Sequence, residues 1–181
     1  MSVNSSKYGG AATPSKEGLR DHERKFQHDM IKGRLAETLI EQLFLSMNYN
    51  VFRFGMENTI PGIMGLLKGI KSDVAQHIKR MPDFVIQNPK NDQVDFVEVK
   101  FRASEYFDYG GLKGDYPFSN VFIIVVSKRH IKCLSVEELK NGKCITPDCS
   151  SYLGSRKEFN LEKQVIVDFC EFACKFFANV A

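Results

Sequence analysis

The sequence of 181 residues contains no tryptophan and no apolar segment long enough to cross a membrane. Its longest apolar run, Val121–Val126, is far shorter than the roughly 20 residues that a transmembrane helix requires. Residues 1–30 also lack the apolar core of a secretory signal. These absences predict a cytoplasmic protein without a membrane partner.

Disulfide frameworks and nucleotide-binding motifs are also absent from the sequence. The five cysteines are an odd number in no disulfide-type pattern, which fits a reducing compartment. Cys170 and Cys174 have a spacing that zinc sites sometimes use, but their place among apolar helix positions favours core packing. The four histidines do not have the spacing of a metal site or a catalytic triad, and no P-loop or dinucleotide fingerprint occurs.

The composition favours one globular domain. The chain is 43% hydrophobic and contains fifteen phenylalanines and six tyrosines, which can form an aromatic-rich core. Residues 1–18 are rich in Ser, Gly, Ala and Pro and cannot offset the entropy of ordering by burial. We therefore expect a flexible N-terminal tail over 1–18 and a single domain over 19–181. The net charge of +3 is too small to indicate a polyanionic partner by itself.

Two runs of β-branched and aromatic residues, 82–86 and 93–100, predict an antiparallel hairpin. The break between them begins with Asn88 and Pro89, which suit the first two positions of a type I turn. A turn of this length places Asn88 opposite Gln93. That pairing fixes the register of the two strands over their whole length.

The predicted register brings two acids together, because it places Asp83 directly opposite Glu98. Opposed side chains have Cβ atoms roughly 4.5–5.5 Å apart, so one hard cation can bridge the two carboxylates. The strand period of two then places Lys100 on the same face, about 6.6 Å along the strand. Two acids held together repel each other unless a proton or a cation neutralises them, so the pair indicates a metal site.

These residues resemble a known signature. Pro82-Asp83, followed on the second strand by Glu98-Val99-Lys100, resembles the motif of the PD-(D/E)xK nuclease superfamily, which has the restriction-endonuclease-like fold. The resemblance covers about residues 30–128. It implies an α/β fold with a mixed central sheet flanked by helices, in an αβββαβ-type order.

A long amphipathic helix is predicted from about Arg20. Its apolar residues recur at three- and four-residue steps, and they are Phe26, Met30, Leu35, Leu39, Ile40, Leu43, Phe44 and Met47. At about 100° per residue, Glu37 lies at the border of the core stripe and Glu41 points toward solvent. Residues 32–37, Lys-Gly-Arg-Leu-Ala-Glu, are similar to the start of the first helix in archaeal Holliday-junction resolvases of the superfamily. That similarity implies that Glu37 completes the metal site, whereas an ordinary helix glutamate is a surface charge.

Two segments depart from the compact resolvases. After a short strand at 50–54, residues 55–81 predict two short helices that are broken near Gly69, with Ser72 or Asp73 capping the second. This insertion separates the first strand from the second. Residues 104–120 support only a turn or two where the superfamily usually has a full helix, and they contain the aromatic residues Tyr106, Phe107, Tyr109, Tyr116 and Phe118. We prefer packing of this aromatic loop over the sheet edge to stacking on unpaired bases.

The C-terminal part completes the predicted fold. Residues 121–127 predict a central strand that is buried on both faces. Residues 131–135 predict a further strand, and 136–141 a short helix that ends at Gly142. A closing amphipathic helix over 161–180 covers the sheet, and its apolar stripe contains Val165, Ile166, Phe169, Ala173, Phe176, Phe177 and Val180.

The resemblance implies a Mg²⁺-dependent nuclease that hydrolyses phosphodiester bonds in DNA, of a structure-selective, restriction or repair type. Asp83 and Glu98 would then hold the ion, for which Mn²⁺ can substitute, and the Val99 carbonyl would be a further ligand. Glu37 would be a ligand or orient water. Lys100 would position the attacking water and offset the negative charge that develops on the phosphate.

Basic residues gather immediately before the hairpin. Between residues 61 and 81 four cations face one anion, Asp73. Such a cluster is usually a solvated helix face, but its position beside the acid pair makes contact with phosphates an equal alternative. The residues predicted to bind nucleic acid are Lys68, Lys71, Lys79, Arg80 and Arg102.

Other functions stay open at this point. A nucleic-acid-binding module that kept the fold and lost activity would show the same sheet, although the intact Asp, Glu and Lys argue for an enzyme. A different acid-metal enzyme and a structural domain are further alternatives. The sequence leaves open the DNA structure or sequence preference, DNA versus RNA, endonuclease versus exonuclease action, the number of metal ions, and whether a homodimer forms.

Overall fold

The computed structural model describes residues 20–55, 62–112 and 114–178, without the side chain of Met64. The predicted tail over 1–18 and Val180 lie outside the described residues. The elements in chain order are α1 (Asp21–Ser46), β1 (Asn50–Arg53), α3 (Ile63–Leu66), α4 (Asp73–Lys79), β2 (Phe84–Asn88), β3 (Gln93–Phe101), η1 (Tyr109–Leu112), β4 (Val121–Val126), β5 (Ile131–Ser135), α5 (Val136–Lys140), η2 (Leu153–Ser155) and α6 (Lys163–Phe177). No helix in these ranges is long and apolar enough to span a membrane.

The strands form one mixed five-stranded sheet in the order β1-β2-β3-β4-β5. Neighbouring strands are antiparallel except β3 and β4, which run parallel. A parallel pair needs a crossover connection, and residues 102–120 provide it with only the short helix η1. The α/β class and the mixed sheet that the sequence predicted are confirmed. The predicted central position of the strand at 121–127 is also confirmed, since β4 lies between β3 and β5.

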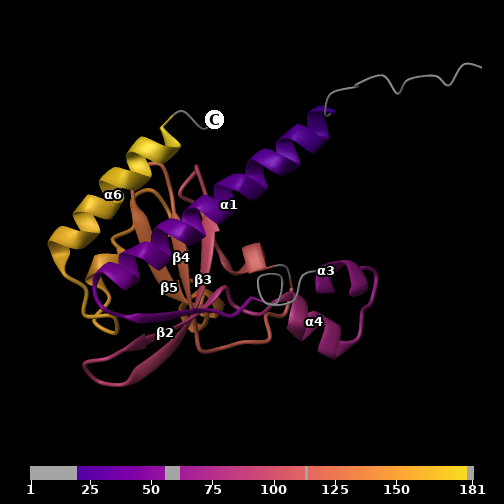
Figure 1. Ribbon diagram of the computed structural model, residues 1–181, viewed down its shortest axis with the longest axis horizontal. Coiled ribbons are helices and arrows are strands. Elements are labelled where there is room, and N and C mark those ends of the chain that lie inside the picture. The colour runs from indigo at the N-terminus through magenta and orange to yellow at the C-terminus, as the bar shows by residue number, and fades with distance from the viewer. Residues whose placement is uncertain (1–19, 56–61, 113, 179–181) are drawn as a thin grey trace, which may run out of the picture.

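One face of the sheet packs against the two long helices. Figure 1 shows α1 and α6 side by side across this face. Apolar residues at alternating strand positions pack against the apolar stripe of α1 and form one hydrophobic core with it. The fully buried members include Leu43 and Phe44 of α1, Phe84 and Val97 of the hairpin, and Ile124 of β4.

The opposite face is covered by the crossover loop and α5. Phe107 and Tyr116 of the loop are buried there against Ile123 and Val125 of β4. The preferred interpretation of the aromatic loop, packing over the sheet, is therefore confirmed for these two residues. Tyr106 differs, since it is 50% exposed.

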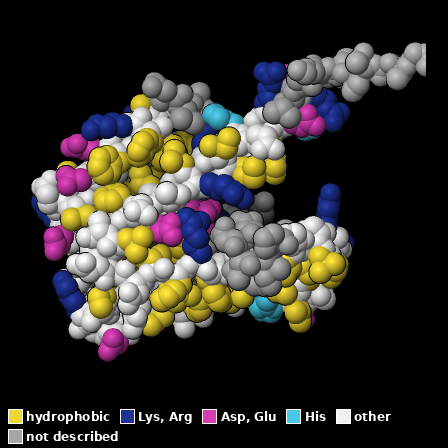
Figure 2. All heavy atoms as spheres, viewed as in Figure 1, with side chains coloured by type: hydrophobic (Ala, Val, Ile, Leu, Met, Phe, Trp, Pro, Cys, Tyr) yellow, Lys and Arg dark blue, Asp and Glu magenta, His cyan; other side chains and the backbone are white. Residues whose placement is uncertain are grey.

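The two outer helices keep apolar side chains on the surface, as Figure 2 shows for the face that α1 and α6 cover. The exposed ones include Phe26, Met30 and Ile31 in α1 and Val167, Phe172 and Phe176 in α6. The sequence wrongly placed Phe176 in the core stripe. Ile166, Ala173 and Phe177 are the buried residues of α6, and at 100° per residue Phe176 lies about 80° from that narrow stripe.

The predicted insertion between the first and second strands is confirmed as two short helices. Gly69 lies in the break between α3 and α4 with φ of 82°, a conformation that favours glycine. The hydroxyl of Ser72 accepts a hydrogen bond from the N–H of Ala75 and so caps α4. In Figure 1 this pair of helices lies at one end of the molecule, away from α6.

Glu138 joins α5 to a distant loop. Its carboxylate accepts hydrogen bonds from the Ser135 N–H and from the Arg156 guanidinium, both at 2.8 Å, and from Lys143 at 3.0 Å. Burial alone would raise the pKa of Glu138, but these hydrogen bonds outweigh it and lower the pKa to about 2. The charged form of Glu138 therefore stabilises the fold.

We predict that Glu138→Gln lowers the free energy of unfolding at pH 7 by about 1–3 kcal/mol, because the charge that Arg156 and Lys143 stabilise is lost. A lowered pKa stabilises the folded state above the unfolded value, so the difference between the proteins should disappear as the pH falls from 4.5 toward about 2. Denaturant unfolding at several pH values measures this difference. The exposed neighbour Glu137, changed to Gln, is the control, and a pH-independent difference would contradict the prediction.

Candidate active site

The hairpin has the predicted register. Asn88 pairs with Gln93 and Phe84 with Val97, so the next step along both strands places Asp83 opposite Glu98. Asp83 lies just before β2, where two backbone groups hold it in place. Its Oδ2 accepts a hydrogen bond of 2.7 Å from the Val99 N–H, and its carbonyl accepts one of 2.8 Å from the Phe54 N–H.

Glu98 and Lys100 form an ion pair on β3 through Oε1 and Nζ. The residues are two positions apart, so their side chains share one face of the strand, as predicted. Glu98 is 8% exposed, and its second oxygen, Oε2, is buried without a hydrogen-bond partner in the described part of the chain. A buried carboxylate oxygen without a partner is a position where a cation or a donor would bind.

Burial and neighbouring charges shift the pKa values of both Glu98 and Lys100. Burial raises the pKa of Glu98, and the nearby charge of Glu37 raises it further, against the attraction of Lys100. Burial works to lower the pKa of Lys100, but the charges of Glu98 and Asp83 outweigh it and the pKa is raised. The lysine therefore stays an ammonium ion at neutral pH, and Arg53 is a further cation close to Glu37 and Asp83.

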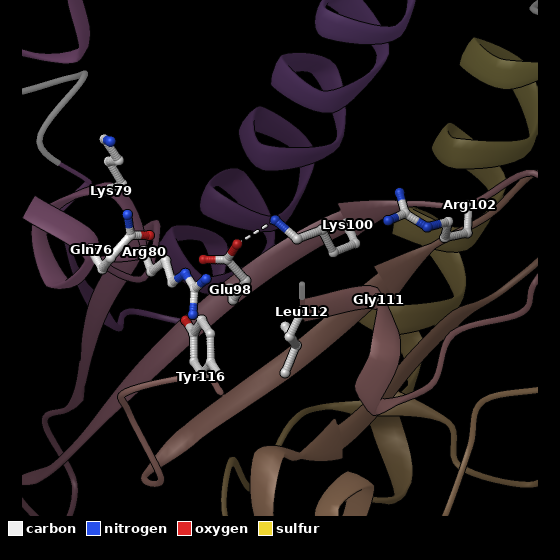
Figure 3. A pocket seen from close by; sticks show the side chains of 9 residues that line it. All are labelled: Gln76, Lys79, Arg80, Glu98, Lys100, Arg102, Gly111, Leu112 and Tyr116. Carbon is white, nitrogen blue, oxygen red and sulfur yellow. Dashed lines mark hydrogen bonds and ion pairs between the residues drawn. The ribbon is translucent and has the colours of Figure 1, made fainter. Parts of the chain in front are cut away.

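A hollow of about 510 Å³ opens beside this ion pair (Figure 3). α4 and its C-terminus contribute one wall, β3 the floor, and the crossover loop the other wall. Four of the lining side chains are cations and one is an acid. The lining residues are Gln76, Lys79, Arg80, Glu98, Lys100, Arg102, Gly111, Leu112 and Tyr116.

Three of the five residues predicted to bind nucleic acid line this hollow, namely Lys79, Arg80 and Arg102. The other two, Lys68 and Lys71, are exposed and do not line it. Arg80 also reaches across the hollow, since its guanidinium donates a hydrogen bond of 2.5 Å to the Asp115 carbonyl in the crossover loop. The insertion and the crossover loop are therefore connected to each other.

Glu37 lies in a neighbouring hollow of about 380 Å³ that Lys100 and Arg102 also line. Its side chain is 14% exposed and lies 4.0 Å from Arg53 of β1. The prediction that Glu37 approaches the acid pair agrees with its effect on the pKa of Glu98. The described residues contain no group of three or more His, Cys, Asp or Glu side chains that could hold a metal ion, so Glu37, Asp83 and Glu98 do not form a three-carboxylate group.

The prediction that Glu41 points toward solvent is wrong. Its side chain is 17% exposed and forms a salt bridge of 2.5 Å with Arg53. The helix angle was correct in placing Glu41 away from the core, but α1 crosses above β1, whose Arg53 covers this flank of the helix. Arg53 also stacks over the Phe84 ring and so fixes the start of β2 against α1.

The side chains present fit a Mg²⁺ ion held mainly by water. Mg²⁺ keeps several waters and needs only one or two protein carboxylates, so the absence of a third acid does not exclude it. Asp83 and Glu98 are adjacent, and Glu98 Oε2 has no other partner in the described part of the chain. The role of the Val99 carbonyl stays a prediction, while the Val99 N–H is already bonded to Asp83.

Sequence reasoning missed four of the lining residues, Gln76, Gly111, Leu112 and Tyr116, and of these Tyr116 has the most unusual environment. It was grouped with the aromatic residues of the crossover loop, and its side chain is indeed only 4% exposed. Its hydroxyl is nevertheless buried without a hydrogen-bond partner among the described residues, beside Glu98 and Arg80. No spacing in the sequence distinguishes Tyr116 from Tyr109, whose hydroxyl accepts the Tyr116 N–H.

Comparisons of the chain with family models, with curated proteins and with solved structures found no match. The assignment of function therefore depends on the residues of the site and on the order of the strands.

We predict that Lys100→Met, measured in EDTA at pH 7, lowers the free energy of unfolding by about 2–4 kcal/mol, because Glu98 stays buried without its cation. The double variant Glu98→Gln/Lys100→Met should recover most of this loss. The raised pKa of Glu98 means that its protonated form favours folding, so the loss in Lys100→Met should shrink as the pH falls toward that pKa.

Denaturant unfolding of wild type and both variants tests this coupling, with the exposed hairpin residue Lys90, changed to Met, as the control. Equal stability of Lys100→Met and wild type would show that the ion pair contributes nothing to the fold.

Proposed function

We propose that the protein is a metal-dependent nuclease that hydrolyses phosphodiester bonds in DNA and belongs to the PD-(D/E)xK superfamily. The observation that carries this proposal is the meeting of Asp83, Glu98 and Lys100 at the end of one hairpin, beside a hollow lined with cations. Acids alone are common on protein surfaces. Here the Asp83 carboxylate is held by the Val99 N–H and the Glu98 carboxylate by Lys100, and Glu98 Oε2 is buried without a partner in the described part of the chain.

The order of the elements supports the same proposal. The αβββαβ-type core that the resemblance implies begins with a helix and three antiparallel strands, as α1, β1, β2 and β3 do. β4 then returns parallel to β3. The differences are the inserted helices α3 and α4 and the 3₁₀ turn η1 in place of a full crossover helix.

The proposed chemistry divides between the acids and the lysine. Asp83 and Glu98 would hold Mg²⁺ or Mn²⁺, which would supply acidification of a bound water and neutralisation of charge on the phosphate. Lys100 donates to the attacking water and offsets the developing negative charge, since its raised pKa keeps it protonated at neutral pH. Glu37 approaches from the neighbouring hollow, which suits orientation of water better than direct metal binding.

The cations around the hollow suit contact with the phosphate backbone. Lys79, Arg80 and Arg102 surround Glu98 and Lys100, so a phosphate placed at the acids would be close to several positive charges. Lysines are point charges with little directional recognition, and contacts with phosphates position DNA without reading its sequence. We therefore propose DNA as the partner and backbone contact as the mode of binding.

Cleavage is the decisive test. Purified wild-type protein should cut linear duplex, branched or single-stranded DNA with Mg²⁺ or Mn²⁺ and not with EDTA. Lys100→Ala should lower the cleavage rate by roughly 10²-fold or more while DNA and metal binding persist, as is common when a positioned electrostatic group is lost. Asp83→Asn should abolish cleavage through loss of the metal. A higher Mg²⁺ concentration should partly restore cleavage by Asp83→Asn and should not restore cleavage by Lys100→Ala.

The hairpin supplies matched controls, because Lys90 and Asp92 are exposed residues between β2 and β3. Lys90→Ala and Asp92→Asn should cleave like wild type. A wild-type protein that binds DNA but cuts no form of it with either metal would favour the binding module without activity. Normal turnover by folded Lys100→Ala would remove Lys100 from the proposed chemistry.

The proposed phosphate contact predicts a change in salt dependence. The triple variant Lys68→Ala/Lys71→Ala/Lys79→Ala should weaken DNA binding equally for unrelated sequences and lower the slope of log affinity against log salt by up to about 3, since each phosphate contact adds roughly 0.9. Fluorescence anisotropy in Ca²⁺ at several salt concentrations measures the slope. The exposed lysines Lys90, Lys157 and Lys163, changed together, are the control, and an unchanged slope in the first triple would show that Lys68, Lys71 and Lys79 do not contact DNA phosphates.

A further inference from the structure

The Tyr116 hydroxyl is an unusual feature of the hollow. Buried tyrosine hydroxyls normally find a hydrogen-bond partner, because the loss of hydration is otherwise uncompensated. Tyr116 is 4% exposed, and its hydroxyl has no partner among the described residues although it lines the hollow. A phenylalanine would fill the same space without that unsatisfied group.

A second buried oxygen in the same hollow, Glu98 Oε2, lacks a hydrogen-bond donor among the described residues, whereas the Tyr116 hydroxyl lacks an acceptor there. Glu98 Oε2 is also buried and without a partner in the described part of the chain, and it can only accept a hydrogen bond or bind a cation. The Tyr116 hydroxyl is able to donate. In Figure 3 the Tyr116 hydroxyl, the Arg80 guanidinium and the Glu98 carboxylate all point into the same space. A ligand that satisfies both oxygens therefore presents a cation or a hydrogen-bond donor to Glu98 Oε2 and an acceptor to the Tyr116 hydroxyl.

A phosphodiester with a divalent cation has this pair of properties. Its non-bridging oxygens accept hydrogen bonds and carry charge, and the cation bridges them to carboxylates. Arg80, Lys79 and Lys100 supply positive charge around the same space. We propose that Tyr116 donates its hydroxyl to a non-bridging oxygen of the phosphate that reacts at Glu98 and Lys100, with Arg80 as the neighbouring cation. This assignment rests on the proposed nuclease function and adds a substrate contact to it.

The crossover loop holds Tyr116 in this orientation. The Tyr116 N–H donates to the Tyr109 hydroxyl at 3.3 Å, and the preceding carbonyl, that of Asp115, accepts from Arg80. The Tyr116 ring packs edge-on against Phe118 at 5.9 Å between centroids. A hydroxyl that is fixed before the substrate binds needs little reorganisation during the reaction.

Tyr116→Phe separates this role from simple packing. The variant keeps the ring and removes only the oxygen without a partner, so the melting temperature should stay the same or rise. At saturating DNA with Mg²⁺, its cleavage rate should fall by roughly 10²-fold, the lower end of the effect of losing one positioned donor. Tyr106→Phe is the matched control, because Tyr106 is 50% exposed and its hydroxyl bonds to Asp108.

Binding to a fluorescein-labelled DNA duplex in Ca²⁺, followed by anisotropy, gives a second measurement that does not depend on cleavage. If wild type binds this DNA without cutting it, the nuclease proposal fails, and a loss of affinity of about threefold to tenfold in Tyr116→Phe would still support the phosphate contact.

Three results would overturn the assignment of Tyr116. In the first, wild type cleaves DNA and Tyr116→Phe cleaves it at the same rate, which leaves the nuclease proposal intact. In the second, wild type binds without cleavage and Tyr116→Phe binds equally well. In the third, wild type neither cuts nor binds DNA, and both proposals fall together.

Discussion

The hydrogen bond from the Val99 N–H to the Asp83 carboxylate connects the start of β2 to β3 beside the candidate site. A shift of the hairpin by one residue would move Asp83 away from Glu98 and would also turn Phe84 and Val97 out of the core. The same constraint therefore maintains the hydrophobic core and the acid pair. The site needs no flexible loop to bring its acids together, because the sheet does so when it forms.

Burial then gives these acids their chemical character. Glu98 lies on the face of β3 opposite the α1 core, where the crossover loop and α4 screen it from water. Desolvation makes the charged form of Glu98 less favourable, and the ion pair with Lys100 offsets only part of this loss of free energy. A cation or a proton would offset the rest, because either one reduces the uncompensated charge that burial leaves on the carboxylate.

The sequence predicted the parts of this structure that depend on local periodicity. Strand alternation and the length of the turn determined the register of Asp83 and Glu98, and helix periodicity located Glu37 at the border of the core. Partners from distant segments were not predictable in this way. The angle of Glu41 on α1 gave no sign of Arg53, and Tyr116 could not be separated from the other aromatic residues of its loop, because only the folded crossover places it beside Glu98.

The hydrogen bond between Arg80 and Asp115 joins two segments that are far apart in the sequence, the helices α3 and α4 with the residue that follows them and the connection between β3 and β4. A side chain from the first segment therefore holds the backbone of the second. A side chain at position 114 would be strained because Gly114 has a φ of 93°, and its Cβ would lie in ordinary contact with the Arg80 guanidinium, at 3.6 Å. A change in the position of either segment is therefore expected to move the other, because this hydrogen bond joins them.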